Sequence, residues 1–212
     1  MQDIEFKNIE GDELEDFLGR VEESFGIEFH GRELYEVHTF NELSDHIKNK
    51  IELSHKDDCT SQQAFYKIRK VLSDCIELNK QTIETSTLIS DIIPRKGRRK
   101  QIRRIENSLG FKINILSPTA FVIGIILLLF LASLVSFFFS WEYGLIGLLI
   151  SIVGFRIAYA LGIELELTTV GEIAEKMTRE NYIQSRRDPN TYNPNEIENL
   201  LKDWFKRDFA VE

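Results

Sequence analysis

The residue types that most often hold metals or attack substrates are few in this chain. Its four histidines are spaced by 8, 8 and 9 residues, which does not place them on one helix face as a metal-binding pair requires: His30, His38, His46 and His55. Its two cysteines, Cys59 and Cys75, have no C-x-x-C spacing. The sequence also lacks a glycine-rich phosphate loop and a G-x-S-x-G motif. We therefore expect surface histidines, no catalytic residues, no metal and no cofactor.

The densest group of charged side chains is basic. Seven cations fall within ten residues without an acid among them: Arg95, Lys96, Arg98, Arg99, Lys100, Arg103 and Arg104. A nucleic-acid site is not expected, because aromatic residues do not alternate with these cations and no known motif contains them. Anionic lipid headgroups are the expected ligand, with each cation contributing about 1 kcal/mol near such a surface. Contact with the acidic N-terminal part, in this chain or a neighbouring one, is compatible with that role.

The net charge of −8 over 212 residues conceals separate blocks. Residues 1–58 carry −11, residues 59–112 carry +7, residues 113–163 are neutral, and residues 164–212 carry −4. The acids of 1–58 favour a solvated or partner-binding face over acid–base catalysis. A uniform soluble globule is excluded by this division. The acidic start of the chain is not that of a signal peptide.

Two apolar segments predict a transmembrane hairpin at 117–163. Residues 113–141 contain no charged side chain, and 143–163 contain only Arg156. About 20 helical residues cross a hydrocarbon core of about 30 Å. Arg156 is expected to extend to the interface, with a buried functional cation as the alternative. The bend has one acid and no base, so the positive-inside rule places both termini in the cytoplasm.

Small residues recur along the second apolar segment at spacings of 4, 3, 4 and 4: Gly147, Ser151, Gly154, Ala158 and Gly162. This spacing places them on one helix face, where two backbones can approach closely. Packing within the hairpin is favoured over a dimerisation face. A dimerisation face is the alternative, and with it a homo-oligomer.

Two stretches of the chain repeat. Residues 20–29 align with 104–113 in the pattern R-[VI]-E-x-S-[FL]-G-[IF]-x-[FI], at an offset of 84. Residues 39–47 align with 169–177 at an offset of 130. The difference of 46 residues is an insertion in the second copy, and it coincides with the apolar hairpin. A duplication with a membrane hairpin inserted in its second copy explains both matches.

Apolar periodicity predicts an all-α protein. Helices are expected at 12–25, ending at Gly26, at 64–80 and at 96–109. Thr39 with Glu42 forms a predicted capping box, and Thr169 with Glu172 repeats it. A last amphipathic helix at 195–212, with Asn195 as its expected N-cap, comes after two prolines.

This arrangement resembles the acyl carrier protein family, in which a helix ending E-x-x-[FL]-G-[IV] precedes one opening T-V-x-[DE]-[LI]. Residues 22–27 with 39–47, and 106–111 with 169–177, match these two elements. The resemblance implies a phosphopantetheine-binding fold and an attachment serine. Glu13 occupies that serine's position in the first copy, and 94–99 contains no Asp-Ser in the second. Ser24 and Ser108, at the ends of their helices, are expected at surface or C-terminal positions. The resemblance therefore implies degenerate carriers that have lost the attachment chemistry.

The first copy lacks an opening helix, and helix 195–212 is expected either to pack back on it as a permuted element or to dock on another chain. The expected parts are 1–56, an acidic carrier-like module; 57–63, a linker; 64–116 and 164–182, the second module around the hairpin 117–163; 183–194, a linker; and 195–212, the last helix. The expected function is a non-enzymatic protein anchored in the inner or plasma membrane, presenting its modules to a protein partner on the cytoplasmic face. Working carriers, biosynthetic accessory subunits and small structural membrane proteins are the alternatives.

Overall fold

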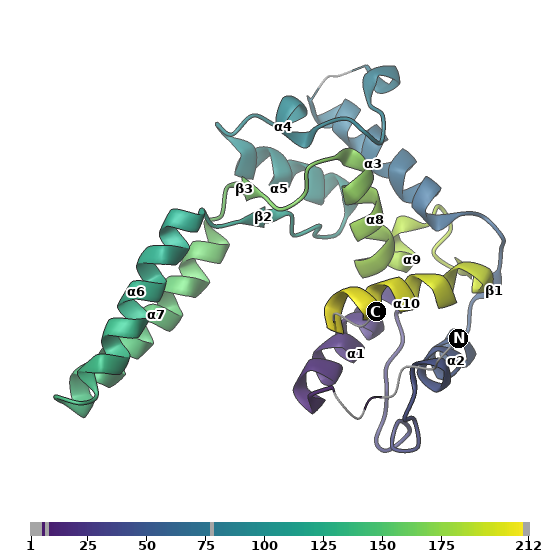
Figure 1. Cartoon of the computed structure of the whole chain (residues 1–212). Coiled ribbons are helices and arrows are strands. Elements are labelled where there is room, and N and C mark those ends of the chain that lie inside the picture. The colour runs from purple at the N-terminus through teal and green to yellow at the C-terminus, as the bar shows by residue number, and fades with distance from the viewer. Residues whose placement is uncertain (1–5, 7–8, 77–78, 210–212) are drawn as a thin grey trace. The chain divides into compact units, whose positions relative to one another are not determined.

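A computed structural model describes residue 6 and residues 9–76 and 79–209. Helix accounts for 66% of the chain and strand for 6%, which agrees with the predicted all-α class. The described residues form ten α-helices and four two-residue strands. The chain divides into two compact units (Figure 1). We call Met1–Val71 with Gly171–Glu212 the terminal unit, and Leu72–Val170 the central unit.

The terminal unit is built on α1 (Gly11–Phe25), α2 (Phe40–Lys50), α9 (Tyr182–Ser185) and α10 (Pro194–Phe209). Its buried core joins apolar residues from both ends of the chain: Phe17, Val21, Phe25, Ile27, Phe40, Leu43, Ile47, Ile51, Tyr182, Tyr192, Ile197, Leu201, Trp204 and Phe205. Aromatic rings contact one another throughout it, with the Phe17 and Phe205 centroids 5.4 Å apart. This core confirms that the C-terminal helix packs on the N-terminal half.

The start of α10 differs from the prediction. Asn195 is not its N-cap; the helix begins at Pro194, and the side chain of Asn193 accepts a hydrogen bond from the Asn195 N–H at 3.1 Å. Proline is favoured at the first helical position because it has no N–H to leave unpaired there. Two other predicted helix ends are confirmed: Thr39 and Glu42 form a complete capping box at α2, and α1 ends at Gly26, whose φ of 61° is left-handed.

Two strands also join the ends of the chain in the terminal unit. β1 (Ser54–His55) pairs in parallel with β4 (Thr191–Tyr192). The segment after β1 leads into α3 (Thr60–Ile76), which starts four residues before the predicted 64. The reason is non-local, since the Thr60 N–H donates to the carboxylate of Glu196 on α10 at 3.0 Å.

The central unit contains the remaining part of α3, η2 (Lys80–Thr82), α4 (Ile89–Ile92) and α5 (Arg98–Leu109). Two long antiparallel helices come next, α6 (Ala120–Ser136) and α7 (Trp141–Ala160). Strands β2 (Leu116–Ser117) and β3 (Glu164–Leu165) pair antiparallel at the base of this hairpin (Figure 1). The inserted segment therefore closes on itself.

The division of the chain differs from the predicted modules in two places, because residues 64–71 as well as residues 171–182, which the sequence assigns to the second module, are grouped with the terminal unit. α8 (Val170–Glu180) begins at the boundary, and Gly171 onward is grouped with the terminal unit, whereas the sequence assigns 164–182 to the second module. Ser24 on α1 shows why: its hydroxyl donates to the Arg179 carbonyl at 2.6 Å and accepts from the Tyr182 N–H at 3.0 Å. The end of α8 is thereby fixed to α1.

Candidate functional site

The clearest repeated geometry is the turn at the end of α1 and of α5. Both helices end at a left-handed glycine, Gly26 at φ 61° and Gly110 at φ 85°. In each, a glutamate of the last turn accepts the backbone N–H seven residues ahead: Glu22 from Phe29, and Glu106 from Ile113 at 3.0 Å. Donors and acceptors are both separated by the offset of 84 found in the sequence. The sequence match therefore corresponds to one hydrogen-bonded turn that occurs twice.

The positions that carry the attachment serine in carrier proteins have other residues. Glu13 is exposed in the first turn of α1, where a carboxylate is stabilised by the helix dipole. In the central unit Gly97 precedes α5 with a φ of 80°. Ser24 is not at the surface: it is 1% exposed and hydrogen-bonded on both sides, whereas Ser108 is exposed and 3.5 Å from the sulfur of Cys75. Glu13 and the segment 94–99, the two places that correspond to the attachment serine, therefore offer no hydroxyl.

The small residues of α7 face α6, and Gly162, just past the end of α7, faces the backbone of β2. Ser151 and Ala158 are 1% and 8% exposed. A Cβ added at Gly147 would lie 2.6 Å from the Cβ of Ser133, and one at Gly162 would lie 2.6 Å from the backbone of Ser117. Gly154 is looser, since its nearest neighbour, Ile126, would lie 3.8 Å away. This face is used for packing within the hairpin.

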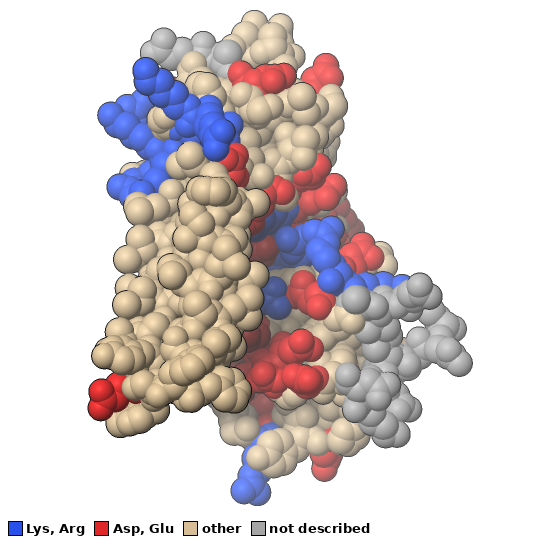
Figure 2. All heavy atoms as spheres, turned by 60° about the vertical axis from the view of Figure 1, so that its left-hand side comes forward, with Lys and Arg blue, Asp and Glu red and all other residues tan. Residues whose placement is uncertain are grey.

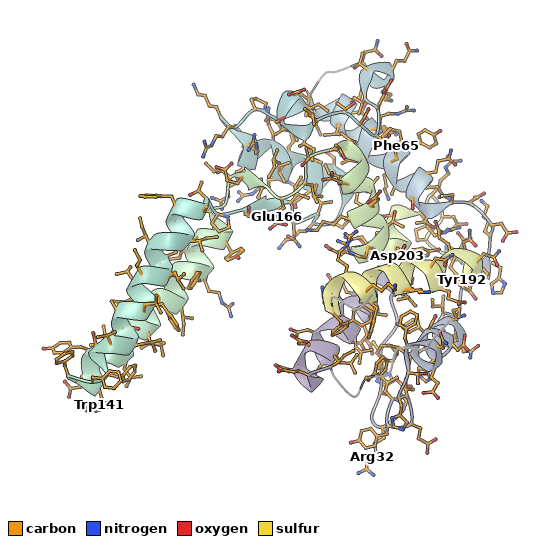
Figure 3. All side chains as sticks on the ribbon, in the orientation of Figure 1. Arg32, Phe65, Trp141, Glu166, Tyr192 and Asp203 are labelled. Atoms are coloured by element: carbon orange, nitrogen blue, oxygen red, sulfur yellow. The ribbon has the colours of Figure 1, made fainter. Side chains whose placement is uncertain are left out.

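Large apolar side chains cover the outside of the same hairpin. Phe121 is 77% exposed, Leu128 68% and Ile150 59%. α7, with 20 residues, is long and apolar enough by length and composition to cross a membrane, and α6 is apolar but has 17 residues. The apolar sequence continues past α6 through a turn of three phenylalanines, of which Phe138 is 90% exposed. Trp141 stands at the tip and Glu166 at the opposite end, the base (Figure 3). Arg156, on α7, is exposed.

The predicted basic surface loses one member in the structure. Arg98 is 7% exposed; its Nε donates to the Ile93 carbonyl at 3.2 Å and its Nη1 to the Ile163 carbonyl at 2.9 Å. It therefore ties the start of α5 to the end of the hairpin. Arg95 is exposed and ion-paired with Glu164. The others form a basic patch at the base of the hairpin (Figure 2): Lys96, Arg99, Lys100, Arg103 and Arg104.

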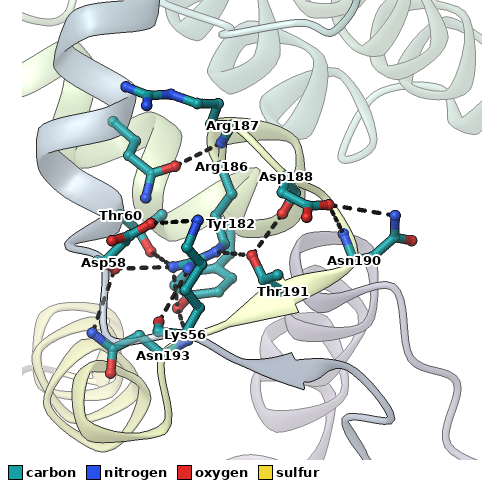
Figure 4. Close-up of polar contacts among 11 residues, drawn as sticks. Lys56, Asp58, Thr60, Tyr182, Arg186, Arg187, Asp188, Asn190, Thr191 and Asn193 are labelled. Carbon is teal, nitrogen blue, oxygen red and sulfur yellow. Dashed lines mark hydrogen bonds and ion pairs between the residues drawn. The ribbon is translucent and has the colours of Figure 1, made fainter.

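A buried arginine that the sequence did not single out organises the terminal unit. Arg186 is 1% exposed and donates hydrogen bonds to the Thr60 hydroxyl at 2.6 Å and the Thr191 hydroxyl at 3.1 Å (Figure 4). It also donates to the backbone carbonyls of Lys56 and Asp58, both at 3.2 Å. A guanidinium has five donors in a fixed plane, which suits a cage of carbonyls and hydroxyls. These partners lie in β4, in the segment after β1 and at the first residue of α3, so Arg186 ties the segment that leads into α3 to β4.

Tyr182 lies beside this arginine and shares its network. Its hydroxyl accepts the Asn193 N–H at 3.0 Å and contacts Glu196 at 3.3 Å. Burial raises the pKa of the Tyr182 phenol. Asp58 has a lowered pKa, chiefly through its hydrogen bond with Lys56. The network joins the two ends of the chain, and its polar groups are engaged with one another, so we assign it a structural role.

The histidines do not converge. His30, His38 and His55 are exposed, and His46 is half-buried with its Nε2 3.8 Å from Glu33. His55 contacts the Tyr192 hydroxyl at 2.7 Å. Among the described residues, His, Cys, Asp and Glu do not form a group of three able to hold a metal ion.

The chain was compared with family models, curated proteins and solved structures. No family model, curated protein or solved structure matches the chain. The resemblance to carrier proteins therefore depends on the two sequence motifs and on the turn that they share.

Proposed function

We propose that this chain is a non-enzymatic membrane protein that holds two carrier-like helical modules at the cytoplasmic face, where they meet a protein partner. The observation that carries the proposal is the hairpin of α6 and α7, which has small residues inside and large apolar residues outside. In water such an exterior is unfavourable by about 25 cal/mol for each Å² of apolar surface. A lipid bilayer removes that penalty.

The charges at the two ends of the hairpin support an orientation with both termini in the cytoplasm. The base carries the basic patch, and the tip carries Glu142 beside Trp141 and Tyr143. Cations are retained on the cytoplasmic side, and Trp and Tyr favour the headgroup region. The closure of the hairpin by β2 and β3 keeps the chain before and after it on one side.

The repeated turn supports two carrier-like modules, one permuted. In the terminal unit α10 supplies the long helix that carriers have at their start, and Phe6 lies 5.6 Å from Phe205 near its C-terminal end. Glu13 has no hydroxyl for a prosthetic group. The modules are thus proposed as surfaces recognised by a partner, with their acidic side chains exposed.

Fractionation of membranes tests the anchor. In the control chain an Asn-Gly turn replaces residues 118–163, joining Ser117 to Glu164, which already face each other across β2 and β3. The full chain should stay in the membrane pellet after alkaline carbonate extraction, and the shortened chain should be soluble and helical. Recovery of the full chain in the soluble fraction would contradict the proposal.

Incubation with a phosphopantetheinyl transferase tests the loss of carrier chemistry. The intact mass of the full chain should not change. A gain of one prosthetic group on any serine would establish a working carrier in its place. Affinity capture from solubilised membranes then separates a partner-binding protein, which retains a defined protein, from a purely structural one, which retains none.

A further inference from the structure

A cavity of about 470 Å³ opens at the base of the hairpin in the central unit. Three segments enclose it: α5, the segment 112–116 that leads into β2, and the last residues of α7, with Glu166 completing the wall. Tyr159 and Ala160 come from the apolar helix, whereas Arg99 and Arg103 come from the basic one. The cavity therefore lies where the apolar hairpin meets the basic patch.

The side chains that line the cavity are suited to one phosphate group. Arg99 and Arg103 are four residues apart and point from the same face of α5. An arginine fork matches two phosphate oxygens at once. Lys112 adds a third cation on the opposite segment.

Two carboxylates limit the positive charge of the cavity. Glu106 already accepts the N–H groups of Ile113 at 3.0 Å and Asn114 at 3.3 Å, so its position is fixed by the turn. With Glu166 it leaves one net positive charge on the lining. A phosphodiester carries one negative charge, so the two charges balance.

We propose that this cavity binds the phosphate of a phospholipid headgroup, with Arg99 and Arg103 as its principal ligands. The inference rests on the proposed membrane insertion, because insertion places the end of α7 at the depth of the headgroups. Tyr159, 57% exposed, has the amphipathic side chain that favours this depth. The lipid phosphate is then held in a defined site rather than attracted by the basic patch as a whole.

The helix itself supplies a matched control. Lys100 and Arg104 are exposed on α5 one residue further on, about 100° around the helix, and do not line the cavity. The pair Arg99→Gln/Arg103→Gln and the pair Lys100→Gln/Arg104→Gln remove the same two charges from the same helix. If the lipid is attracted only by the overall positive charge, the two double variants should lose the same affinity for it. If it binds in the cavity, the Arg99/Arg103 variant should lose more.

The experiment titrates the full chain in an uncharged detergent with short-chain phosphatidylglycerol and measures binding by native mass spectrometry. We expect the Arg99/Arg103 variant to lose about tenfold in affinity or more and the Lys100/Arg104 variant less than about threefold. Equal losses, or no loss in the first variant, would overturn the site. The variant Arg99→Lys/Arg103→Lys keeps the charge without the fork and should bind with intermediate affinity, which keeps the site testable even if the glutamine pair unfolds.

Two further arms identify the source of the phosphate and separate the cavity from the membrane anchor. Glycerol 3-phosphate and inorganic phosphate should bind at least about tenfold more weakly than the lipid; equal binding would assign the site to a soluble phosphate and overturn the lipid. All variants keep the hairpin and should remain in the carbonate-resistant pellet. Loss of the wild-type chain from that pellet contradicts the membrane anchor, whereas insertion without a difference between the two pairs contradicts only the cavity.

Discussion

The turns at the ends of α1 and α5 are alike, but the chain continues differently from each of them. Both have the glutamate that accepts an N–H seven residues ahead and the left-handed glycine. After the first turn the chain reaches α2 within 14 residues, whereas after the second it runs through α6 and α7 before α8. Because the hydrogen bonds of this turn are all local, the turn can form whichever segment follows it. At the second turn β2 and β3 bring the two ends of the α6–α7 hairpin together.

The two turns also differ in where the longer helices of the chain come from. α3 comes before α5 in the sequence, with η2 and α4 between them, whereas α10 reaches α1 from the other end of the chain. The ion pair of Arg20 with Asp208, at 2.7 Å, and the shared aromatic core join α10 to α1. The terminal unit thus depends on a contact that no short segment can make alone.

Among the changes considered, removing α10 should destabilise the terminal unit most. Deletion of 195–212 takes away four core side chains that are at most 1% exposed, Ile197, Leu201, Trp204 and Phe205. Burying each of these contributes about 1.5–3 kcal/mol, so the loss is comparable with the stability of a small domain. We expect residues 1–56 to become sensitive to protease and to lose cooperative melting. Full helicity and a cooperative melt of 1–56 alone would show that α10 is dispensable.

A single substitution in the same helix should be milder. Trp204→Ala removes a ring that contacts Phe17 at 5.4 Å, and we expect it to destabilise the terminal unit by about 3–5 kcal/mol in denaturant unfolding. Asn199→Ala, exposed on the same helix, is the control and should change stability by less than about 0.5 kcal/mol. If the two substitutions changed the stability of the terminal unit by similar amounts, Trp204 would not belong to its core.

In the central unit the closure of the hairpin should be sensitive to one glycine. Gly162→Ala places a Cβ 2.6 Å from the Ser117 backbone, which cannot move aside as a side chain can, and should cost about 1–3 kcal/mol. Gly154→Ala, with 3.8 Å of space, is the matched control and should be tolerated. Thermal unfolding in detergent compares them, and equal melting temperatures would contradict the close approach.

The repeated turn can be broken in each copy separately. Glu22→Ala and Glu106→Ala each remove the acceptor of a backbone N–H, and each should cost about 1 kcal/mol in the unit that contains it. Glu23→Ala, exposed beside the first, is the control. Hydrogen exchange at Phe29 and Ile113 is the direct measurement. A loss of protection in only one copy would mean that the two turns are not equivalent.

The smallest expected effect is the pH dependence of the α2 capping box. The hydrogen bond from the His38 N–H is the main cause of the lowered pKa of Glu42, which lies below its ordinary 4.5. A carboxyl with a lowered folded-state pKa stabilises the fold above its unfolded pKa and loses this contribution as the pH falls through the folded value. Glu42→Gln should therefore flatten the fall in melting temperature below pH 4.5. An unchanged slope would show that the carboxylate does not contribute.

Local patterns predicted much of this fold. Apolar periodicity placed α1, and the capping box and Gly26 placed the start of α2 and the end of α1, because these features depend on residues within a few positions. The repeat located the shared turn, since each copy forms its hydrogen bonds within about ten residues. The small residues of α7 were placed on one face for the same reason.

The features that the sequence did not show depend on distant partners. Arg98 belongs to a basic run, yet the carbonyls of Ile93 and Ile163 bury it. Arg186 has no sequence signal because its acceptors lie more than 120 residues away, apart from Thr191 and Tyr182. The cavity at the base of the hairpin also had no sequence signal. Its lining residues Lys112, Tyr159 and Glu166 are distant from Arg99 and Arg103 in the sequence, and the folding of the hairpin brings them together.

The membrane topology tests the central proposal most directly. With Cys59 and Cys75 replaced by serine, Glu142→Cys at the tip and Lys96→Cys at the base each provide one exposed position. On intact cells a membrane-impermeant maleimide should label the tip variant alone, and lysis should be required to label the base variant. Labelling of the base in intact cells, or equal labelling of both, would contradict a hairpin that crosses the membrane with both modules in the cytoplasm.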